Sequence, residues 1–311
     1  MKVRAVLNRD AGTLATGDME AFAGHVRREF EERGHDVEID VVHGRDVAAR
    51  LRAAGEDGQC DVILAAGGDG TISGAAVTCR EHGKALAVVP GGTMNLFARS
   101  LSVPLDIYEA VTALAAGQTG KVDVATANGR LLLHQYSVGM QHDMVRLRSR
   151  MEYQSRIGKI LSSVRSILRV LRRPRVFDVD VELDGKSRRR SLSVLAVSNN
   201  LHGEGHLPYA DDLTRHRLGV YMAEKLSVTE GARMVTDLVV GTWRTNEDLE
   251  WTEASRAILR FGARHRPRRA LIDGEVCELE DEVVLESVAG GLTVLLPSKN
   301  DATTAGNLDA K

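Results

Sequence analysis

The chain has 311 residues, of which 43% are hydrophobic and 27% are charged, a composition typical of globular proteins with room for two domains. Its formal net charge of −2 argues against binding to nucleic acid through overall charge, and we expect no nucleic-acid partner. The three cysteines, Cys60, Cys79 and Cys277, are far apart and lack metal-binding spacing, so we expect reduced thiols.

Targeting signals are not evident in the sequence. The first residues, MKVRAVLNRD, lack the apolar segment of a signal peptide, and no apolar run is long enough to span a membrane. We therefore expect a cytoplasmic protein whose membrane contact, if any, is peripheral and at the inner membrane surface. We expect the polar residues 298–311 to form a disordered tail.

Residues 1–120 alternate between the patterns of strands and helices. The expected strands are 3–8, 36–42, 61–67 and 85–92. The expected helices are 18–33, 47–54, 71–82 and 105–116. This alternation predicts an α/β domain, in which a parallel sheet has helices on both faces.

From residue 121 the pattern changes to short strands. The expected strands are 131–138, 176–184, 190–198, 218–223, 256–262, 268–273, 282–288 and 292–296, and the expected helices are 153–171 and 227–240. We therefore predict a second, largely antiparallel β domain over 121–297. The fold class is α/β plus β.

The stretch GGDGT at 67–71 follows a predicted buried strand and opens a predicted helix. Gly67, Gly68 and Gly70 would let backbone N–H groups approach a phosphate at the positive end of that helix, and Thr71 could cap the helix or bind the phosphate. Asp69 would repel a phosphate unless a metal or a ribose lies between them, which favours a nucleotide with Mg²⁺. The alternative is a plain strand–helix turn in which Asp69 is a cap.

A second glycine turn, PGGTMN at 90–95, follows the next predicted strand. It places Gly92, Thr93 and Asn95 at the carboxyl end of that strand, while Asn8 ends the first strand of the same sheet. Ligands of parallel sheets bind outside the carboxyl ends of the strands. The two turns and Asn8 therefore predict one site for a nucleoside triphosphate.

These motifs resemble those of the diacylglycerol kinase catalytic-domain family, which includes bacterial soluble lipid kinases and the sphingosine and ceramide kinases. The matching stretches are GGDGT, PGGTMN, VDV at 122–124, VSNN at 197–200, LPYADD at 207–212 and LIDGEV at 271–276. Each stretch is weak alone, whereas their combination in this order is specific. The resemblance covers most of the chain.

The resemblance implies an N-terminal α/β domain similar to that of NAD kinase, which binds the nucleotide, and a C-terminal β-sandwich for the lipid substrate. It implies transfer of the γ-phosphoryl group of ATP to the hydroxyl of a diacylglycerol-like or sphingoid lipid. The residues that match the ATP site are Asn8, Gly67, Gly68, Asp69, Gly70, Thr71, Gly92, Thr93 and Asn95. Asp69 and Asp123 are the candidates for Mg²⁺, and Asp69 is also a catalytic candidate.

Asp273 and Glu275 match a D-G-E motif in which the family's proton acceptor lies. A lipid hydroxyl is a poor nucleophile, and a carboxylate within hydrogen-bond reach can take its proton during phosphoryl transfer. We expect Glu275 to be the base, with Asp273 the next candidate. The alternative is an ordinary hairpin turn with two solvated acids.

The sequence departs from the family pattern at several positions. Leu96 stands where many members carry an aspartate, and Asn8-Arg9 replaces the usual Asn-Pro. RHRLGV at 215–220 lacks the aspartate that holds a structural magnesium in bacterial members, so we expect that site to be absent or altered.

Residues 146–175 are rich in arginine, and within them 157–173 place apolar residues on one helical stripe. A basic amphipathic helix can contact an anionic bilayer transiently, and it can equally pack on the β domain. Two other functions remain open. One is a non-catalytic sensor of nucleotide or lipid, and the other is an NAD kinase, although the later glycine-rich stretch of that family is missing. The lipid and the oligomeric state are not determined by the sequence.

Overall fold

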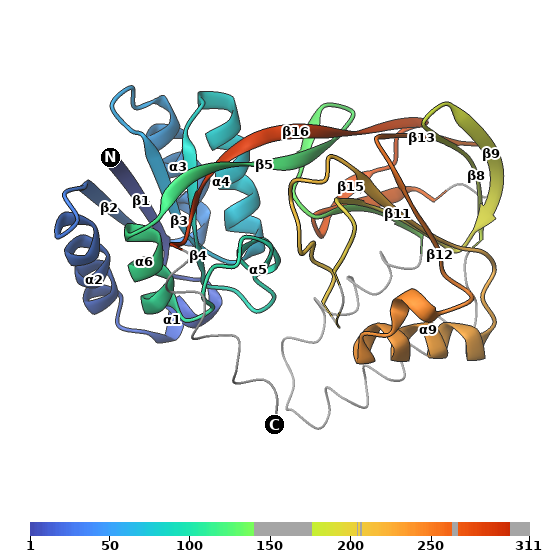
Figure 1. The fold of residues 1–311 in the computed structure, drawn as a ribbon, viewed down its shortest axis with the longest axis horizontal. Helices are drawn as coiled ribbons and strands as arrows, with labels where there is room; N and C mark the ends of the chain where they lie inside the picture. The colour runs from blue at the N-terminus through green and yellow to red at the C-terminus, as the bar shows by residue number, and fades with distance from the viewer. Residues whose placement is uncertain (140–175, 204, 206, 263–266, 299–311) are drawn as a thin grey trace. The chain divides into compact units, whose positions relative to one another are not determined.

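The computed structural model describes residues 1–139, 176–203, 205, 207–262 and 267–298 (Figure 1). The helix expected at 153–171, the segment 146–175 with its expected membrane contact, and all but the first residue of the expected tail lie outside the described residues. The described residues form two compact units, one of residues 1–124 and 289–298, and one of the described residues between 125 and 288. Residues 121–124 and 289–297, which we expected in the second domain, thus belong to the first unit.

The first unit contains a parallel sheet, as predicted. Its strands run in the order β2-β1-β3-β4, followed by the C-terminal part of β16, where Val294 lies opposite Leu86. Their bounds are β1 Lys2–Asn8, β2 Asp36–Val42, β3 Val62–Gly67, β4 Ala85–Pro90 and β16 Glu282–Leu296. Every residue of β3 and β4 is buried, as expected for central strands covered on both faces.

Helices cover both faces of this sheet (Figure 1). Helix α2 (Met19–Glu31) contacts α6 (Ile107–Ala115), and α3 (Val47–Glu56) contacts α4 (Asp69–His82). In α2 the buried residues Phe22, Val26 and Phe30 recur at helical spacing, and the Asp18 side chain caps the first turn. Two short helices, α1 (Gly12–Thr16) and α5 (Leu96–Ser100), were not predicted.

The second unit is a β-sandwich. One sheet is antiparallel in the order β12-β11-β10-β7-β14-β15. The other contains the N-terminal part of β16 with β13, β8 and β9, and also β6 and the end of β5. The bounds are β5 Gln118–Ala127, β6 Arg130–Leu132, β7 Gln135–Gly139, β8 Phe177–Leu183, β9 Lys186–Leu192, β10 Val194–Asn199, β11 Leu218–Ala223, β12 Glu250–Ala254, β13 Arg256–Phe261, β14 Arg269–Ile272 and β15 Glu275–Glu278. One apolar core, which includes Val138, Val197, Val179 and Leu259, draws residues from both sheets.

Three strand predictions differ from the structure in a way that has a physical cause. The run 131–138 covers two strands, β6 and β7, which belong to different sheets. The run 190–198 is two strands, because the chain passes from one sheet to the other at Ser193. The runs 282–288 and 292–296 are one strand, β16, which continues through Gly290 and Gly291. The predicted helix 227–240 is confirmed as α9 (Val228–Val240), which begins with a capping box at Ser227. No helix within the described ranges is long and apolar enough to cross a membrane.

Candidate active site

In the strand order β2-β1-β3-β4, β2 follows β1 on one side and β4 follows β3 on the other side, so the strand order switches between β1 and β3. Open α/β sheets bind ligands at the carboxyl ends of the strands beside such a switch point. Asn8 ends β1, and Thr71 lies in the first turn of α4, directly after β3. The Asn8 Nδ2 donates a hydrogen bond of 3.1 Å to Thr71 Oγ1. Two of the predicted nucleotide-binding side chains are therefore joined across the switch point of the sheet.

The two glycine turns lie in direct contact. Gly91 N donates to Gly67 O at 2.8 Å, and a Cβ atom added to Gly92 would lie 2.7 Å from Gly68 Cα. A Cβ on Gly67 would lie within 2.7 Å of the Thr71 side chain. Glycine is therefore required here for close backbone approach, because any side chain would force the two turns apart.

Asp69 links the two turns. Helix α4 begins at Asp69, after Gly68 as N-cap, so Asp69 lies in the first helical turn, where a carboxylate interacts favourably with the helix dipole. Its Oδ1 accepts a hydrogen bond of 2.9 Å from Leu96 N, and its Oδ2 accepts one of 3.2 Å from Asn95 N. Asp69 thus satisfies amides at the start of α5 rather than its own helix. An ionised carboxylate has about four lone-pair sites, so acceptor capacity remains for a further ligand.

The second turn is shaped by Asn95. Asn95 adopts the left-handed conformation with φ 51°, and its side chain accepts from Gly92 N at 2.8 Å and donates to Gly92 O at 2.9 Å. Thr93 at the tip is exposed. Leu96, where the family often has aspartate, is half-buried and bonds Asp69 through its backbone N–H. That hydrogen bond does not depend on the side chain at 96, so the turn keeps its anchor.

Asp10 and the His43–Gly44 segment lie on the same rim, and the part that His43 and Gly44 take in it was not predicted. Asp10 follows β1, and its carboxylate accepts from Gly44 N at 2.9 Å and contacts His43 Nδ1 at 3.1 Å. The Gly44 hydrogen bond is the main reason that the pKa of Asp10 is below its usual value. The contact joins the segments after β1 and β2, which are 34 residues apart, so sequence spacing gives no signal for it.

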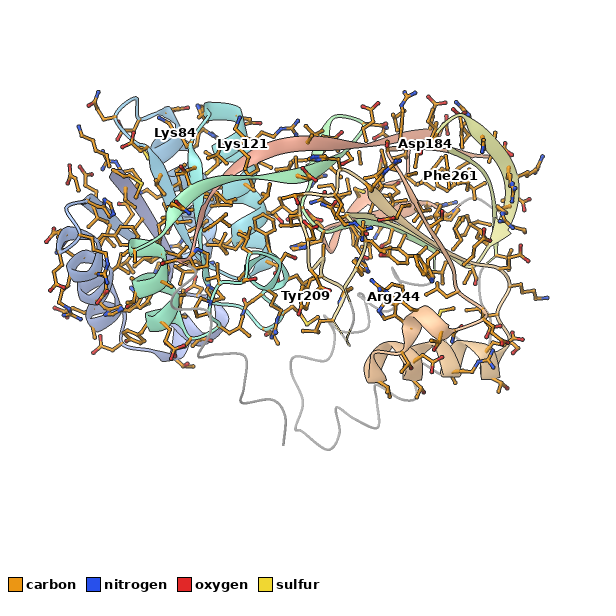
Figure 2. The ribbon with its side chains drawn as sticks, viewed as in Figure 1. Lys84, Lys121, Asp184, Tyr209, Arg244 and Phe261 are labelled. Atoms are coloured by element: carbon orange, nitrogen blue, oxygen red, sulfur yellow. The ribbon has the colours of Figure 1, made fainter. Side chains whose placement is uncertain are left out.

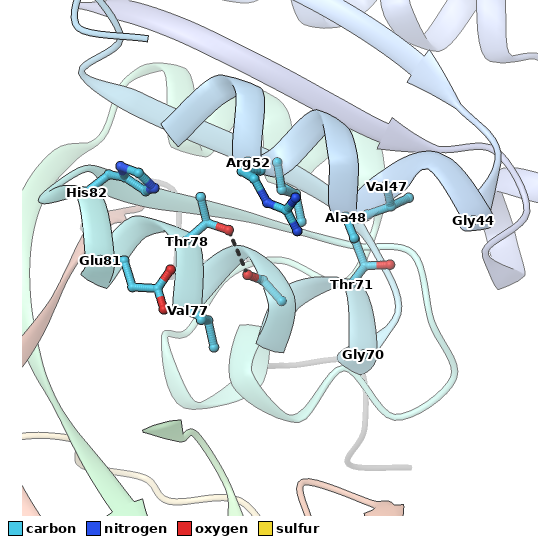
Figure 3. Close-up of a pocket in the computed structure, with 12 residues that line it drawn as sticks. Gly44, Val47, Ala48, Arg52, Gly70, Thr71, Val77, Thr78, Glu81 and His82 are labelled. Atoms are coloured by element: carbon cyan, nitrogen blue, oxygen red, sulfur yellow. Dashed lines mark hydrogen bonds between the residues drawn. The ribbon is translucent and has the colours of Figure 1, made fainter. Parts of the chain in front are cut away.

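A groove between α3 and α4 begins at the first glycine turn (Figure 3). Its volume is about 450 Å³, and it includes Gly70 and Thr71 of that turn. The other lining residues are Gly44, Val47, Ala48, Leu51, Arg52, Gly74, Val77, Thr78, Glu81 and His82. The groove therefore combines apolar side chains with polar ones next to the helix N-terminus.

The residues present fit a magnesium ion only together with a nucleotide. Within the described ranges, no group of three or more His, Cys, Asp and Glu side chains could hold a metal. Mg²⁺ is commonly bound by one or two carboxylates plus substrate phosphates, and Asp69 could supply such a ligand. Asp123 is 1% exposed and accepts a hydrogen bond of 3.0 Å from Gly290 N.

In the second unit, the Asp273-Gly274 turn joins β14 to β15. Both residues have positive φ, 49° and 85°, as a tight two-residue hairpin requires. The Asp273 carboxylate accepts from three backbone amides, those of Leu133, His134 and Gln135, at 2.8–3.1 Å. Asp273 thus fixes the turn against the segment that leads into β7.

Glu275 has a different environment from Asp273. Its side chain is 65% exposed, and its Oε2 lies 3.0 Å from Arg130 Nη2. An exposed pair of this kind contributes little to stability, because water and salt screen it. Because the Glu275 side chain is mostly exposed and backbone amides occupy the Asp273 carboxylate, Glu275 is the acid of this turn whose carboxylate is accessible.

An apolar cavity of about 270 Å³ borders the same turn, and Gly274 is part of its lining. Its floor is a row across neighbouring strands, in which Leu271, Ser137, Ala196 and Tyr221 lie side by side. The rest of the lining is Gln135, Val194, His202, Pro208, Met234, Trp243, Asn246 and Leu249. The sequence did not predict this cavity, because its residues come from segments far apart in the chain.

Aromatic packing supports the cavity wall. His202 stacks on Tyr221 with ring centroids 4.8 Å apart, and Arg244 (labelled in Figure 2) donates to His202 O at 2.7 Å. The Arg244 guanidinium carbon lies 5.3 Å from the Trp243 ring centroid, which is a cation–π distance. Burial lowers the pKa of His202 to about 3, so its imidazole is neutral at physiological pH.

Comparisons with known proteins agree with this architecture. Residues 2–127 match the diacylglycerol kinase catalytic domain. The chain is 26% identical to the diacylglycerol kinase of Bacillus subtilis over 259 residues, which cover 78% of this chain and 82% of that protein. It is 25% identical to an uncharacterized protein of Synechocystis over 279 residues, 85% of this chain and 62% of that protein.

Among solved structures, a putative diacylglycerol kinase from Bacillus anthracis has the same fold. Its TM-score is 0.75 at 21% identity, and the match covers 96% of this chain and 98% of that one. The fold, the glycine turns and the matched domain agree with one another and support a lipid kinase. Residues 2–127 thus match the diacylglycerol kinase catalytic domain, and the chain as a whole is similar to bacterial diacylglycerol kinases.

Proposed function

We propose that this protein is a kinase that transfers the γ-phosphoryl group of ATP to the hydroxyl of a lipid. The observation that carries the proposal is the contact of two glycine turns at the switch point of the first unit, joined by Asp69. Backbone N–H groups of a glycine turn at a helix N-terminus suit the phosphates of a nucleotide. The groove between α3 and α4 begins at Gly70 and Thr71 and offers space for the base and ribose (Figure 3).

Magnesium would enter with the nucleotide. Asp69 is the residue that would hold it, because its carboxylate retains acceptor capacity beside the turn that would bind the phosphates. Bound there, the ion would neutralise charge on the phosphate oxygens during transfer.

The second unit would bind the lipid acceptor. Its apolar cavity suits an alkyl chain, and the D-G-E turn at the edge of the cavity carries the accessible Glu275. Glu275 would take the proton of the lipid hydroxyl as the hydroxyl oxygen bonds to the γ-phosphorus, while the bond to the bridging oxygen breaks and ADP leaves. Asp273 would act as a positioning residue, since backbone amides occupy its carboxylate.

A transfer assay tests the proposal. Purified full-length protein is incubated with Mg²⁺, ATP labelled in the γ-phosphate, and mixed micelles of diacylglycerol, monoacylglycerol, ceramide or sphingosine. We expect label in at least one lipid, and no label in NAD offered as acceptor. Label in NAD alone would instead identify an NAD kinase, and no transfer to any lipid would contradict the proposal.

A non-catalytic nucleotide or lipid sensor is the second candidate. It is favoured by the hydrogen bonds of both motif aspartates, because Asp69 and Asp273 each accept from backbone amides. Such hydrogen bonds are typical of aspartates with a structural role. Binding of ATP without turnover on the whole lipid panel would support this alternative. Turnover that is lost in Glu275→Ala, with ATP binding retained, would exclude it.

A further inference from the structure

The apolar cavity of the second unit contains a buried polar group without a partner. Ser137 is 1% exposed and lines the cavity, and its hydroxyl has no hydrogen-bond partner within the described part of the chain. Strand alternation explains its direction, because Tyr136 and Val138 belong to the core between the sheets and Ser137 therefore lies on the opposite face. Buried hydroxyl groups nearly always have a partner. Two serine hydroxyls of the described residues lack one, those of Ser137 and Ser287, and of these two Ser137 lines the cavity, which points to a ligand there.

Other buried serines of the same sheet region show how the fold normally satisfies a hydroxyl. Ser193, which is 0% exposed, donates to the backbone carbonyl of Glu224, and Ser198, also 0% exposed, donates to that of Asn200. Neither of them lines the cavity. Ser137 differs from both because its hydroxyl has no such partner and the residue lines a cavity that a ligand can fill.

We propose that Ser137 binds the acyl carbonyl oxygen of the lipid acceptor, an inference that rests on the proposed kinase function. The hydroxyl hydrogen of Ser137 requires an acceptor, and a carbonyl next to an alkyl chain places that acceptor inside an apolar cavity. The acceptor would then be an acylated lipid alcohol, such as an acylglycerol or an N-acylated sphingoid. Sphingosine and alkyl ethers of glycerol lack the carbonyl.

The distance from Ser137 to the D-G-E turn suits this chemistry. Ser137 is two residues along β7 from Gln135, whose backbone carbonyl accepts from Asp273 N at 3.0 Å. Two strand residues span about 7 Å. A carbonyl at Ser137 would therefore lie about the length of a glycerol unit from the turn where the reacting hydroxyl is expected.

The uncharged lining also favours an acyl lipid over a sphingoid base. The lining residues include no aspartate, glutamate, lysine or arginine. His202 is neutral because burial lowers its pKa, and burial raises the pKa of Tyr221 to about 12, so its hydroxyl stays protonated. A protonated sphingoid amine would find no counter-charge among these residues, whereas a neutral ester or amide needs none.

A binding experiment without ATP tests this assignment. The protein carries Trp251→Phe, so that Trp243, which lines the cavity, is the only tryptophan left to report binding by fluorescence. The probes are monooctanoylglycerol, the octyl ether of glycerol and N-octanoylethanolamine, all below micelle-forming concentrations. We expect the ester and the amide to bind about tenfold more tightly than the ether. In Ser137→Ala the three probes should bind equally, at the affinity of the ether.

The matched control is Ser193→Ala, which removes a buried hydroxyl outside the cavity and should keep the tenfold preference. Equal binding of the three probes before mutation, or a preference that survives Ser137→Ala, would overturn the assignment. Failure of all three probes to bind would overturn it together with the proposed lipid site. Binding with the expected preference but no phosphoryl transfer would support the assignment and contradict only the proposed kinase activity.

Discussion

Asp69 in the first glycine turn and Asp273 in the D-G-E turn both bind backbone amides of a segment distant in sequence. Asp69 holds two amides at the start of α5, and Asp273 holds three amides at the start of β7. Their surroundings differ, since Asp69 lies at a helix N-terminus and Asp273 in a hairpin whose next acid, Glu275, is exposed. The comparison indicates that a motif aspartate can shape a site, and it leaves the accessible neighbour Glu275 as the residue that we propose for the chemistry.

The largest effect that we expect is a loss of kcat when the accessible acid Glu275 is replaced. Glu275→Gln removes the proposed proton acceptor and should lower kcat by about 10²- to 10⁴-fold, with little effect on ATP binding. The matched control is Glu278→Gln, an exposed acid on the same strand, which should leave kcat unchanged. If both variants retain full activity in the lipid assay, Glu275 is not the base.

Replacing Asp273, whose carboxylate fixes the same turn, should lower the stability of the protein. Asp273→Asn tolerates the positive φ, but an amide cannot accept all three hydrogen bonds, so the free energy of unfolding should fall by about 2–4 kcal/mol. Urea titration measures this change. The control is Asp184→Asn, in another Asp-Gly turn with positive φ, where the carboxylate is exposed and accepts from Ser255 N and Arg256 N. A loss no larger than in that control would contradict the role of Asp273.

The contact of the two glycine turns can be broken directly. In Gly92→Ala the new methyl group would meet Gly68 Cα, which should lower the free energy of unfolding by about 1–3 kcal/mol and weaken ATP binding. Gly24→Ala in α2 is the control, because no atom lies within 4 Å of its added Cβ. It should be neutral or stabilising. Calorimetry with and without an ATP analogue measures both effects. Unchanged ATP affinity in Gly92→Ala would contradict a role of the contact between the two turns in nucleotide binding.

The smallest expected effect concerns pH and the lipid cavity. Folded His202 stays neutral down to about pH 3, whereas the unfolded imidazole takes up a proton near its ordinary pKa of 6.5. Between these values the unfolded state binds more protons, so the free energy of unfolding should fall as pH is lowered, by at most about 1.4 kcal/mol per pH unit. Because His202 as a residue is only half-buried, we expect a smaller slope. Denaturant titrations from pH 7 to 4 should show a shallower slope for His202→Asn, and equal slopes would contradict the burial of the imidazole.

The sequence predicted the features that depend on local pattern. Strand and helix periodicity predicted the parallel sheet and α9. Because the two glycine turns follow successive strands of that sheet, β3 and β4, the sequence also predicted that the turns lie close together. It could not predict which atoms Asp69 and Asp273 bind, because their partners lie 26–27 and 138–140 residues away. The cavity beside Ser137 was missed for the same reason, since a buried serine on a strand has no pattern that separates it from a core residue.

The central claim, that the joined glycine turns bind the phosphates of ATP, is tested most directly by backbone amide NMR of the full-length protein. A non-hydrolysable ATP analogue with Mg²⁺ should shift the amides of Gly68, Gly70 and Thr71 and of Gly92 and Thr93 more than the rest of the chain. Adenosine alone should leave these amides nearly unchanged. Shifts confined to other residues, or equal shifts with adenosine, would contradict the account.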